Sequence, residues 1–137
     1  MRTWILLLSL ALPACAQGSG ADAVITNSGS TNMPGFSITV RSDGWATRQP
    51  ARGTRMERKV LLPVELSNRL FSDLATAAPM SKYPPVRCMK SASFGFTETV
   101  RYNGATSPDL ACPNTDARLS LVVKDVQAVV QAFQKTP

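Results

Sequence analysis

Residues 36–44 read Phe-Ser-Ile-Thr-Val-Arg-Ser-Asp-Gly, and residues 96–104 read Phe-Thr-Glu-Thr-Val-Arg-Tyr-Asn-Gly. Both stretches alternate in polarity, as a strand with one buried face does, and both end in a dipeptide that favours a tight hairpin turn. Five of the nine positions are identical at a constant offset of 60 residues. The repeat is compatible with a duplicated unit, but amphipathic hairpins draw on few residue types and can also coincide by chance.

Two further segments carry apolar residues at helical spacing. The first lies between Pro63, a residue suited to the first position of a helix, and Pro79, with leucines at every fourth position between them. The second follows Cys-Pro at 112–113, with Asn114 or Thr115 available as the N-cap, and its apolar stripe covers 119–133. Each repeated stretch is therefore followed by an amphipathic helix.

These patterns predict an α+β domain with an antiparallel sheet of about four to five strands. We expect a hairpin over 36–48 and a third strand within 56–62 before the first helix. A strand face formed by Phe94, Phe96, Val100 and Tyr102, with a polar return strand, is expected before the second helix. The predicted order is ββ(β)α-ββα, with both helices packed on one face of the sheet. The chain of 137 residues suits one domain, which we assign to 23–137.

The first residues predict export. Arg2 precedes an apolar run over 4–12, which is far too short to span a bilayer but is typical of a secretory signal. Ala-Cys-Ala at 14–16 has the small-x-small form of a cleavage site. We therefore expect a signal peptide over 1–16 and a flexible leader over 17–22, which would make the protein secreted or periplasmic.

The alternative at the same site is a lipoprotein. Leu-Pro-Ala-Cys at 12–15 resembles a lipobox, in which Cys15 would be lipidated and would anchor the protein to the membrane. Proline before the alanine departs from that motif. Both routes place the protein outside the cytoplasm, and no transmembrane segment is expected.

Cys88 and Cys112 are the two cysteines that remain after processing. In an oxidising compartment a disulfide between them is the default expectation. Their separation of 24 residues corresponds to about 3–4 kcal/mol of loop-closure entropy. A redox-active pair would need a close C-x-x-C spacing, so the sequence predicts a structural disulfide.

The composition excludes the commonest catalytic designs. The chain contains no histidine, which removes histidine-based triads, general bases and metal sites. The mature domain lacks G-x-S-x-G, Ser-x-x-Lys and P-loop motifs, and its acidic residues are scattered singly. We therefore predict no cofactor, no metal site and no enzymatic activity.

The positive charge is concentrated in one segment. Lys and Arg number 15 against 9 Asp and Glu, a formal net charge of +6 that becomes +5 if Arg2 is removed with the signal. Five basic residues within 48–59 form a candidate site for an anionic envelope component or a protein: Arg48, Arg52, Arg55, Arg58 and Lys59. The alternative is a solvated loop and a charged strand that discourages edge pairing. Nucleic acid is not expected, because export and the absence of a recognition motif argue against it.

Glu98 is the other unusual position. Strict alternation places it on the apolar row with Phe96 and Val100, where burial would raise its pKa and allow it to act as an acid or base. The alternative is that it lies beyond the sheet edge or pairs with an arginine. No sequence spacing places a second carboxylate near it, so a paired-acid hydrolase is not supported. A deep polar pocket around Glu98 or Ser91 would favour an enzyme.

Several stretches together resemble a group of small, uncharacterised, exported bacterial proteins. They are residues 25–32 leading to 42–44, and residues 87–95 leading to 102–104 and 107–113. The resemblance covers most of the mature chain and implies no activity, substrate or catalytic residue. Cys15 departs from it, because a soluble protein of this kind does not need that residue.

The sequence therefore favours a non-enzymatic domain outside the cytoplasm that acts as a binding, inhibitor or accessory protein of the cell envelope. Two alternatives remain: a lipid-anchored structural lipoprotein and a hydrolase that works without histidine. The oligomeric state is left open.

Overall fold

The computed structural model describes residues 21–52 and 56–135. The predicted cleavage site, Cys15 and most of the leader lie outside the described residues, as does Arg55 of the basic segment.

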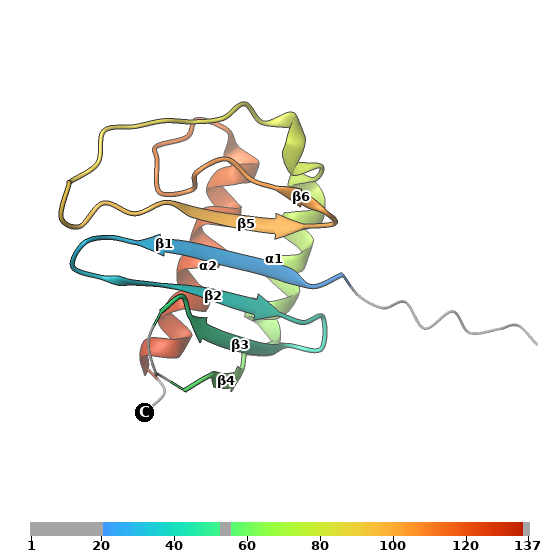
Figure 1. Cartoon of the computed structure of the whole chain (residues 1–137). Helices are drawn as coiled ribbons and strands as arrows, with labels where there is room; N and C mark the ends of the chain where they lie inside the picture. Colours follow the sequence, from blue (N-terminus) through green and yellow to red (C-terminus); the bar gives the residue numbers. More distant parts are fainter. Residues whose placement is uncertain (1–20, 53–55, 136–137) are drawn as a thin grey trace, which may run out of the picture.

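Six antiparallel strands form one open sheet in the order β4-β3-β2-β1-β5-β6 (Figure 1). The strands are β1 (Ala23–Gly29), β2 (Pro34–Val40), β3 (Trp45–Pro50), β4 (Arg58–Leu61), β5 (Glu98–Tyr102) and β6 (Ala105–Thr106). Both long helices, α1 (Val64–Ala77) and α2 (Ala117–Lys135), lie on one face of this sheet, and a 3-10 turn, η1 (Met80–Lys82), follows α1. The α+β class is confirmed, but the strand number and order, ββββα-ββα, differ from the prediction.

The additional strand is β1, which occupies the centre of the sheet. It pairs with β2, the next strand of the chain, on one side and with the remote strand β5 on the other, so both of its edges are hydrogen-bonded. Its second half reads Asn-Ser-Gly, which local propensity assigns to a turn. Because the hydrogen bonds from β5 come from a segment remote in sequence, the local pattern did not reveal the strand.

The two copies of the repeated stretch flank this central strand. Ile25 of β1 faces Ile38 of β2 on one side and Val100 of β5 on the other. From β2 and from β5 the chain then turns outward, into β3 and into the two-residue strand β6. Phe94 was predicted to lie on the face of the second strand. It lies instead in a turn before β5 and is largely exposed.

The two hairpin turns differ in geometry. Asn103 and Gly104 both have positive φ, of 49° and 78°, as the predicted two-residue type I′ turn requires. In the first hairpin only Gly44 has positive φ, and the N–H of Arg41 bonds to the carbonyl of Trp45. That connection is therefore a three-residue loop, in which only one residue must adopt a left-handed conformation.

The helix starts also differ slightly from the prediction. Pro63 is the N-cap of α1 rather than its first residue, and its carbonyl accepts the N–H of Ser67. At α2 the cap is Asp116, whose Oδ1 accepts the N–H groups of Arg118 (2.9 Å) and Leu119 (3.2 Å). Asn114 and Thr115 lie just before it.

The core fills the space between the sheet and the two helices. Its fully buried side chains alternate along the strands and recur at helical spacing in α1 and α2: Ile25, Ile38, Val40, Val100, Leu70, Leu74, Val122, Val126, Val129 and Phe133. Within the described residues no helix is long and apolar enough to cross a membrane.

Candidate functional site

The long connection between η1 and β5, residues 84–97, is called the cystine loop below. Cys88 in this loop forms a disulfide with Cys112, which confirms the predicted pair; the two Cα atoms are 5.6 Å apart. The bond ties the loop to the segment between β6 and α2. Residues 84–90 form no helix or strand, and no backbone–backbone hydrogen bond of theirs is found within the described chain.

Lys90 is held on the other side of Met89. Its ammonium group donates to the carbonyl of Phe96 and forms an ion pair with Asp109 Oδ2. The second oxygen of Asp109 accepts the backbone N–H groups of Glu98 and Ala111, both at 3.0 Å. Burial opposes ionisation of Asp109, but these hydrogen bonds and the charge of Lys90 outweigh it and lower the pKa of its carboxyl. Asp109 is therefore the fixed point to which the loop is attached.

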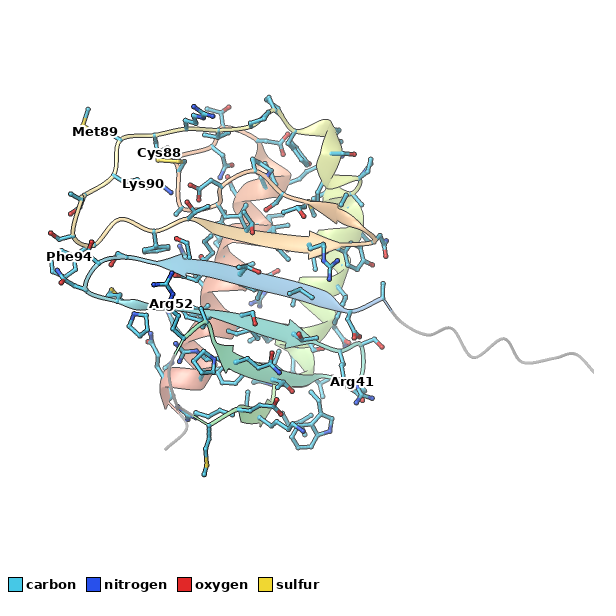
Figure 2. All side chains as sticks on the ribbon, in the orientation of Figure 1. Arg41, Arg52, Cys88, Met89, Lys90 and Phe94 are labelled. Carbon is cyan, nitrogen blue, oxygen red and sulfur yellow. A yellow bond between two sulfur atoms is a disulfide. The ribbon has the colours of Figure 1, made fainter. Side chains whose placement is uncertain are left out.

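Met89 lies between these two attached residues and is itself completely exposed, with a relative exposure of 101%. Figure 2 shows it projecting from the end of the molecule, away from the disulfide and Lys90. An exposed apolar side chain between two restrained neighbours loses little backbone entropy when a partner binds. Methionine also adapts its shape to irregular apolar pockets.

The far part of the cystine loop is braced against the β1–β2 turn. The N–H of Asn32 donates to the carbonyl of Ser93 (3.3 Å), and the hydroxyl of Thr31 donates to the carbonyl of Ala92 (3.4 Å). These two segments expose two more large apolar side chains, Met33 at 52% and Phe94 at 59%. Met33, Met89 and Phe94 are together called the apolar end.

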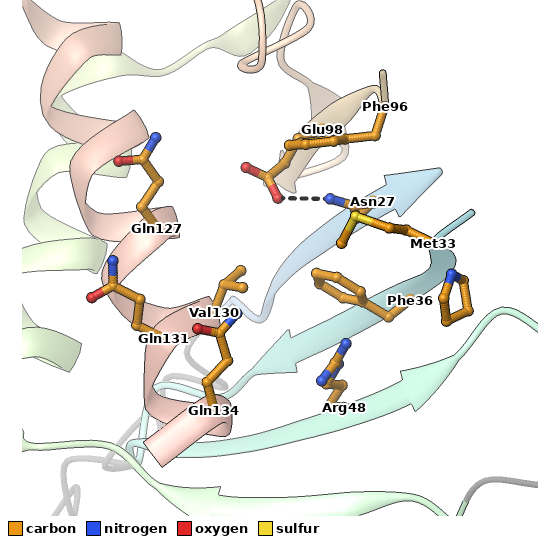
Figure 3. A pocket seen from close by; sticks show the side chains of 11 residues that line it. Asn27, Met33, Phe36, Arg48, Phe96, Glu98, Gln127, Val130, Gln131 and Gln134 are labelled. Carbon is orange, nitrogen blue, oxygen red and sulfur yellow. Dashed lines mark hydrogen bonds between the residues drawn. The ribbon is translucent and has the colours of Figure 1, made fainter. Parts of the chain in front are cut away.

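Behind this end lies a cavity of 430 Å³ between the sheet and α2, here called the Glu98 cavity (Figure 3). Glu98 is confirmed on the buried face of its strand and is only 8% exposed. Its Oε1 accepts a hydrogen bond of 3.2 Å from Asn27 Nδ2, and the other side-chain atom of that amide, Oδ1, accepts the N–H of Gly29. Burial raises the pKa of the Glu98 carboxyl, with a smaller contribution from nearby Asp109, while the Asn27 bond partly lowers it.

The opposite wall of the cavity comes from α2, with Arg48 at its lower end in the view of Figure 3. Three glutamines on successive turns of the helix, Gln127, Gln131 and Gln134, line it. The guanidinium carbon of Arg48 lies 4.2 Å from the centre of the Phe36 ring, a cation–π contact. The described residues contain no group of three or more histidine, cysteine, aspartate or glutamate side chains that could hold a metal ion.

The predicted basic site is divided by the structure. Arg48 on β3 and Arg58 on β4 are opposite each other in the strand register, and both lie on the helix-covered face. Lys59 lies on the opposite face and forms an ion pair of 3.3 Å with Glu57. Arg52 is exposed beside the β1–β2 turn. Arg55 lies outside the described residues. The four described residues therefore do not form one continuous basic surface.

Sequence reasoning missed two of the features that define this end of the molecule. Asp109 follows β6 in sequence, and only the fold brings it to the backbone of Glu98. The positions of Met89 and Lys90 could have been noticed from the sequence. Both residues follow Cys88 directly, and residues next to a structural cysteine are held in place by its disulfide.

Comparisons of the chain with protein-family models, with curated proteins and with solved structures returned no match.

Proposed function

We propose that this protein is an exported, non-enzymatic inhibitor that inserts Met89 of the cystine loop into the apolar specificity pocket of an extracytoplasmic protease. The observation that carries the proposal is the complete exposure of Met89 between Cys88, fixed by a disulfide, and Lys90, fixed by Asp109. Binding energy at protein interfaces concentrates in a few such anchoring side chains.

The backbone of the cystine loop supports a protease as the partner. Residues 84–90 leave their N–H and carbonyl groups without backbone partners in the described chain. Protease clefts bind extended peptides by adding them to a strand edge and by receiving alternate side chains in pockets. A loop that is already held in place gives tight binding because less conformational entropy is lost. Met33 and Phe94, on two segments that contact each other at the far part of the cystine loop, would extend the contact in that direction.

A binding role suits the rest of the molecule better than catalysis. The chain has no histidine, and the neighbouring carboxylate, Asp109, is engaged by Lys90 and two backbone N–H groups. Glu98 therefore has no second acid free to act with it in a paired-carboxylate mechanism.

Inhibition of purified subtilisin-type and chymotrypsin-type proteases tests the proposal. We expect the unmodified protein to inhibit at least one of them competitively, and Met89→Asp to raise the inhibition constant by roughly 100-fold or more, because a charge would enter an apolar pocket. Met56→Asp is the matched control, since Met56 is 89% exposed and lies outside the cystine loop.

A second readout follows from the disulfide. If the protease slowly cuts the bond between Met89 and Lys90, the chain should gain the mass of one water while Cys88–Cys112 keeps the two fragments together. Equal inhibition by the two aspartate variants, or no inhibition of either protease class, would refute the proposal.

Export is part of the same proposal. A protease inhibitor of this kind would act after removal of residues 1–16, as a secreted or periplasmic protein, or while attached to the membrane through Cys15. The intact mass of the protein purified from its native host separates the two routes. A chain beginning at Gln17 indicates soluble export, and a diacylglyceryl group on Cys15 indicates anchoring.

A further inference from the structure

The Glu98 cavity contains a buried carboxylate without a cationic partner among the described residues. Glu98 Oε1 accepts a hydrogen bond from Asn27, and no hydrogen bond to Oε2 is found within residues 21–52 and 56–135; Oε2 points across the cavity toward Gln127 in Figure 3. The nearest lysine of the cystine loop, Lys90, is engaged with Asp109 and Phe96 instead. Because a desolvated carboxylate is unfavourable without an opposite charge, a cationic ligand group would be stabilised at this position.

A positive group stands at the other end of the same cavity. The Arg48 guanidinium carbon lies 4.2 Å from the centre of the Phe36 ring. The N–H donors lie in the plane of the guanidinium group, five in number, so a ligand carboxylate can bind at the edge alongside the contacts that Arg48 already makes. The cavity therefore offers a negative group and a positive group to the same ligand.

The strand positions set the distance between these two groups. The Glu98 carboxylate, from β5, reaches Asn27 on β1, and the Arg48 guanidinium, from β3, lies over Phe36 on β2. β5 and β3 are three strand spacings of about 4.8 Å apart, and the two side chains extend toward the strands between them, so the charged groups are separated by roughly 5–14 Å. An extended dipeptide spans about 7 Å and, with a hydrogen bond of about 3 Å at each end, reaches across most of this range, whereas a single amino acid spans only about 3.5 Å.

The remaining lining suits the uncharged parts of such a ligand. The amides of Gln127, Gln131 and Gln134 can both donate to and accept from a peptide group. Phe96 and Val130 supply apolar surface for a side chain. The volume of 430 Å³ lies within the range of small-molecule sites.

From this arrangement we propose that the Glu98 cavity binds a zwitterion of dipeptide size, with its ammonium group on Glu98 and its carboxylate on Arg48. The site lies on the helix side of the sheet and is separate from Met89, so this inference does not depend on protease inhibition.

Titration of the isotope-labelled protein with the dipeptide Ala-Phe, followed by two-dimensional NMR, tests the inference. We expect shifts confined to cavity residues. Blocking either end, as N-acetyl-Ala-Phe or Ala-Phe amide, should weaken binding at least about 10-fold, because a desolvated charge loses its partner. Free phenylalanine should bind weakly, since it cannot reach both charges.

Two variants assign the two charges. The Glu98→Gln variant should bind Ala-Phe and N-acetyl-Ala-Phe with equal affinity. The Arg48→Met variant retains an unbranched chain over Phe36 and should bind Ala-Phe and Ala-Phe amide with equal affinity. Arg101→Met is the matched control, because Arg101 is exposed and its side chain lies on the opposite face of the sheet from Glu98 and Val100. The inference would be overturned if Ala-Phe did not bind, or if blocking both ends left its affinity unchanged. It would also be overturned if Arg101→Met weakened Ala-Phe binding as much as Glu98→Gln and Arg48→Met do.

Discussion

Glu98 illustrates how one residue departs from the pattern around it. It occupies the row of Ile25 and Val100 on the buried side of the sheet, but the side chain facing it on β1 is the amide of Asn27. The polar pair is tolerated because the cavity leaves the second carboxylate oxygen accessible rather than enclosed by apolar atoms. An acid in a core row is therefore accommodated by an opening in the packing.

The raised pKa of Glu98 predicts a pH-dependent stability. Folding raises the pKa of Glu98 above its value in the unfolded chain, so the folded state binds the proton more tightly. The stability of the wild-type protein therefore decreases as the pH rises from the unfolded-state pKa through the folded-state pKa. The glutamine side chain of the Glu98→Gln variant cannot ionise, so the variant escapes this loss. The unfolding free energy of the variant minus that of the wild type should therefore increase as the pH rises through this window. Urea denaturation at about pH 4 and about pH 8 measures the difference.

The matched control for this experiment is Glu65→Gln, which changes an exposed acid in the first turn of α1. The burial argument would be contradicted if the difference in unfolding free energy between wild type and Glu98→Gln stayed constant with pH. It would also be contradicted if Glu65→Gln showed the same pH-dependent difference.

At the scale of elements, the hairpins and helices follow from short patterns, and their ends follow from single residues. Asn103-Gly104 forms the turn that its sequence favours, because both residues tolerate positive φ. Asp43-Gly44 does not, since the N–H of Trp45 bonds to Asp43 Oδ1 and only Gly44 turns to positive φ. The central strand β1 was missed because its turn-forming residues are held extended by β2 and β5.

The two helices are also connected by a charged pair that their amphipathic patterns did not reveal. Asp125 occupies a buried position in the apolar stripe of α2, and its Oδ1 accepts a hydrogen bond from Arg69 Nε of α1. Arg69 remains largely exposed at its outer end. The pair fixes which turns of α1 and α2 face each other, because Asp125 would otherwise be a buried charge without a partner.

The N-cap of α2 gives a prediction at this scale. Asp116→Ala should lower the free energy of unfolding by about 1 kcal/mol, since the N–H groups of Arg118 and Leu119 lose their acceptor. Thermal or urea denaturation measures the change. Thr115→Ala is the control and should have little effect, and a larger loss in Thr115→Ala than in Asp116→Ala would mean that the helix starts earlier.

At the scale of the whole molecule, the candidate functional features lie at the end where the cystine loop meets the β1–β2 turn. The disulfide, the Lys90–Asp109 ion pair and the hydrogen bonds from Thr31 and Asn32 all brace this end. The apolar end lies on its outside, and the Glu98 cavity lies behind it, toward α2. The fold therefore serves as a rigid support for a long connection without regular structure.

Removal of the disulfide should affect both stability and presentation of Met89. We expect the double variant Cys88→Ala/Cys112→Ala to lose about 3–4 kcal/mol of unfolding free energy, because the closed loop of 24 residues no longer restricts the unfolded chain. Urea denaturation measures this loss. Hydrogen exchange of the cystine loop should accelerate more than that of β1 and β2, whereas a uniform acceleration would show that the bond does not restrain the loop selectively.

The sequence alone determined the α+β class, the two helices, the hairpins and the disulfide, because each follows from local periodicity, turn chemistry or pairing of the two cysteines outside the predicted signal; it left open whether Glu98 is buried. It could not determine that β1 is central, that the basic residues are split between two faces, or that Asp109 holds Lys90 beside Met89. Those features depend on which distant segments become neighbours. That choice is made by the packing of the whole sheet against both helices, and the candidate site is formed where such segments meet.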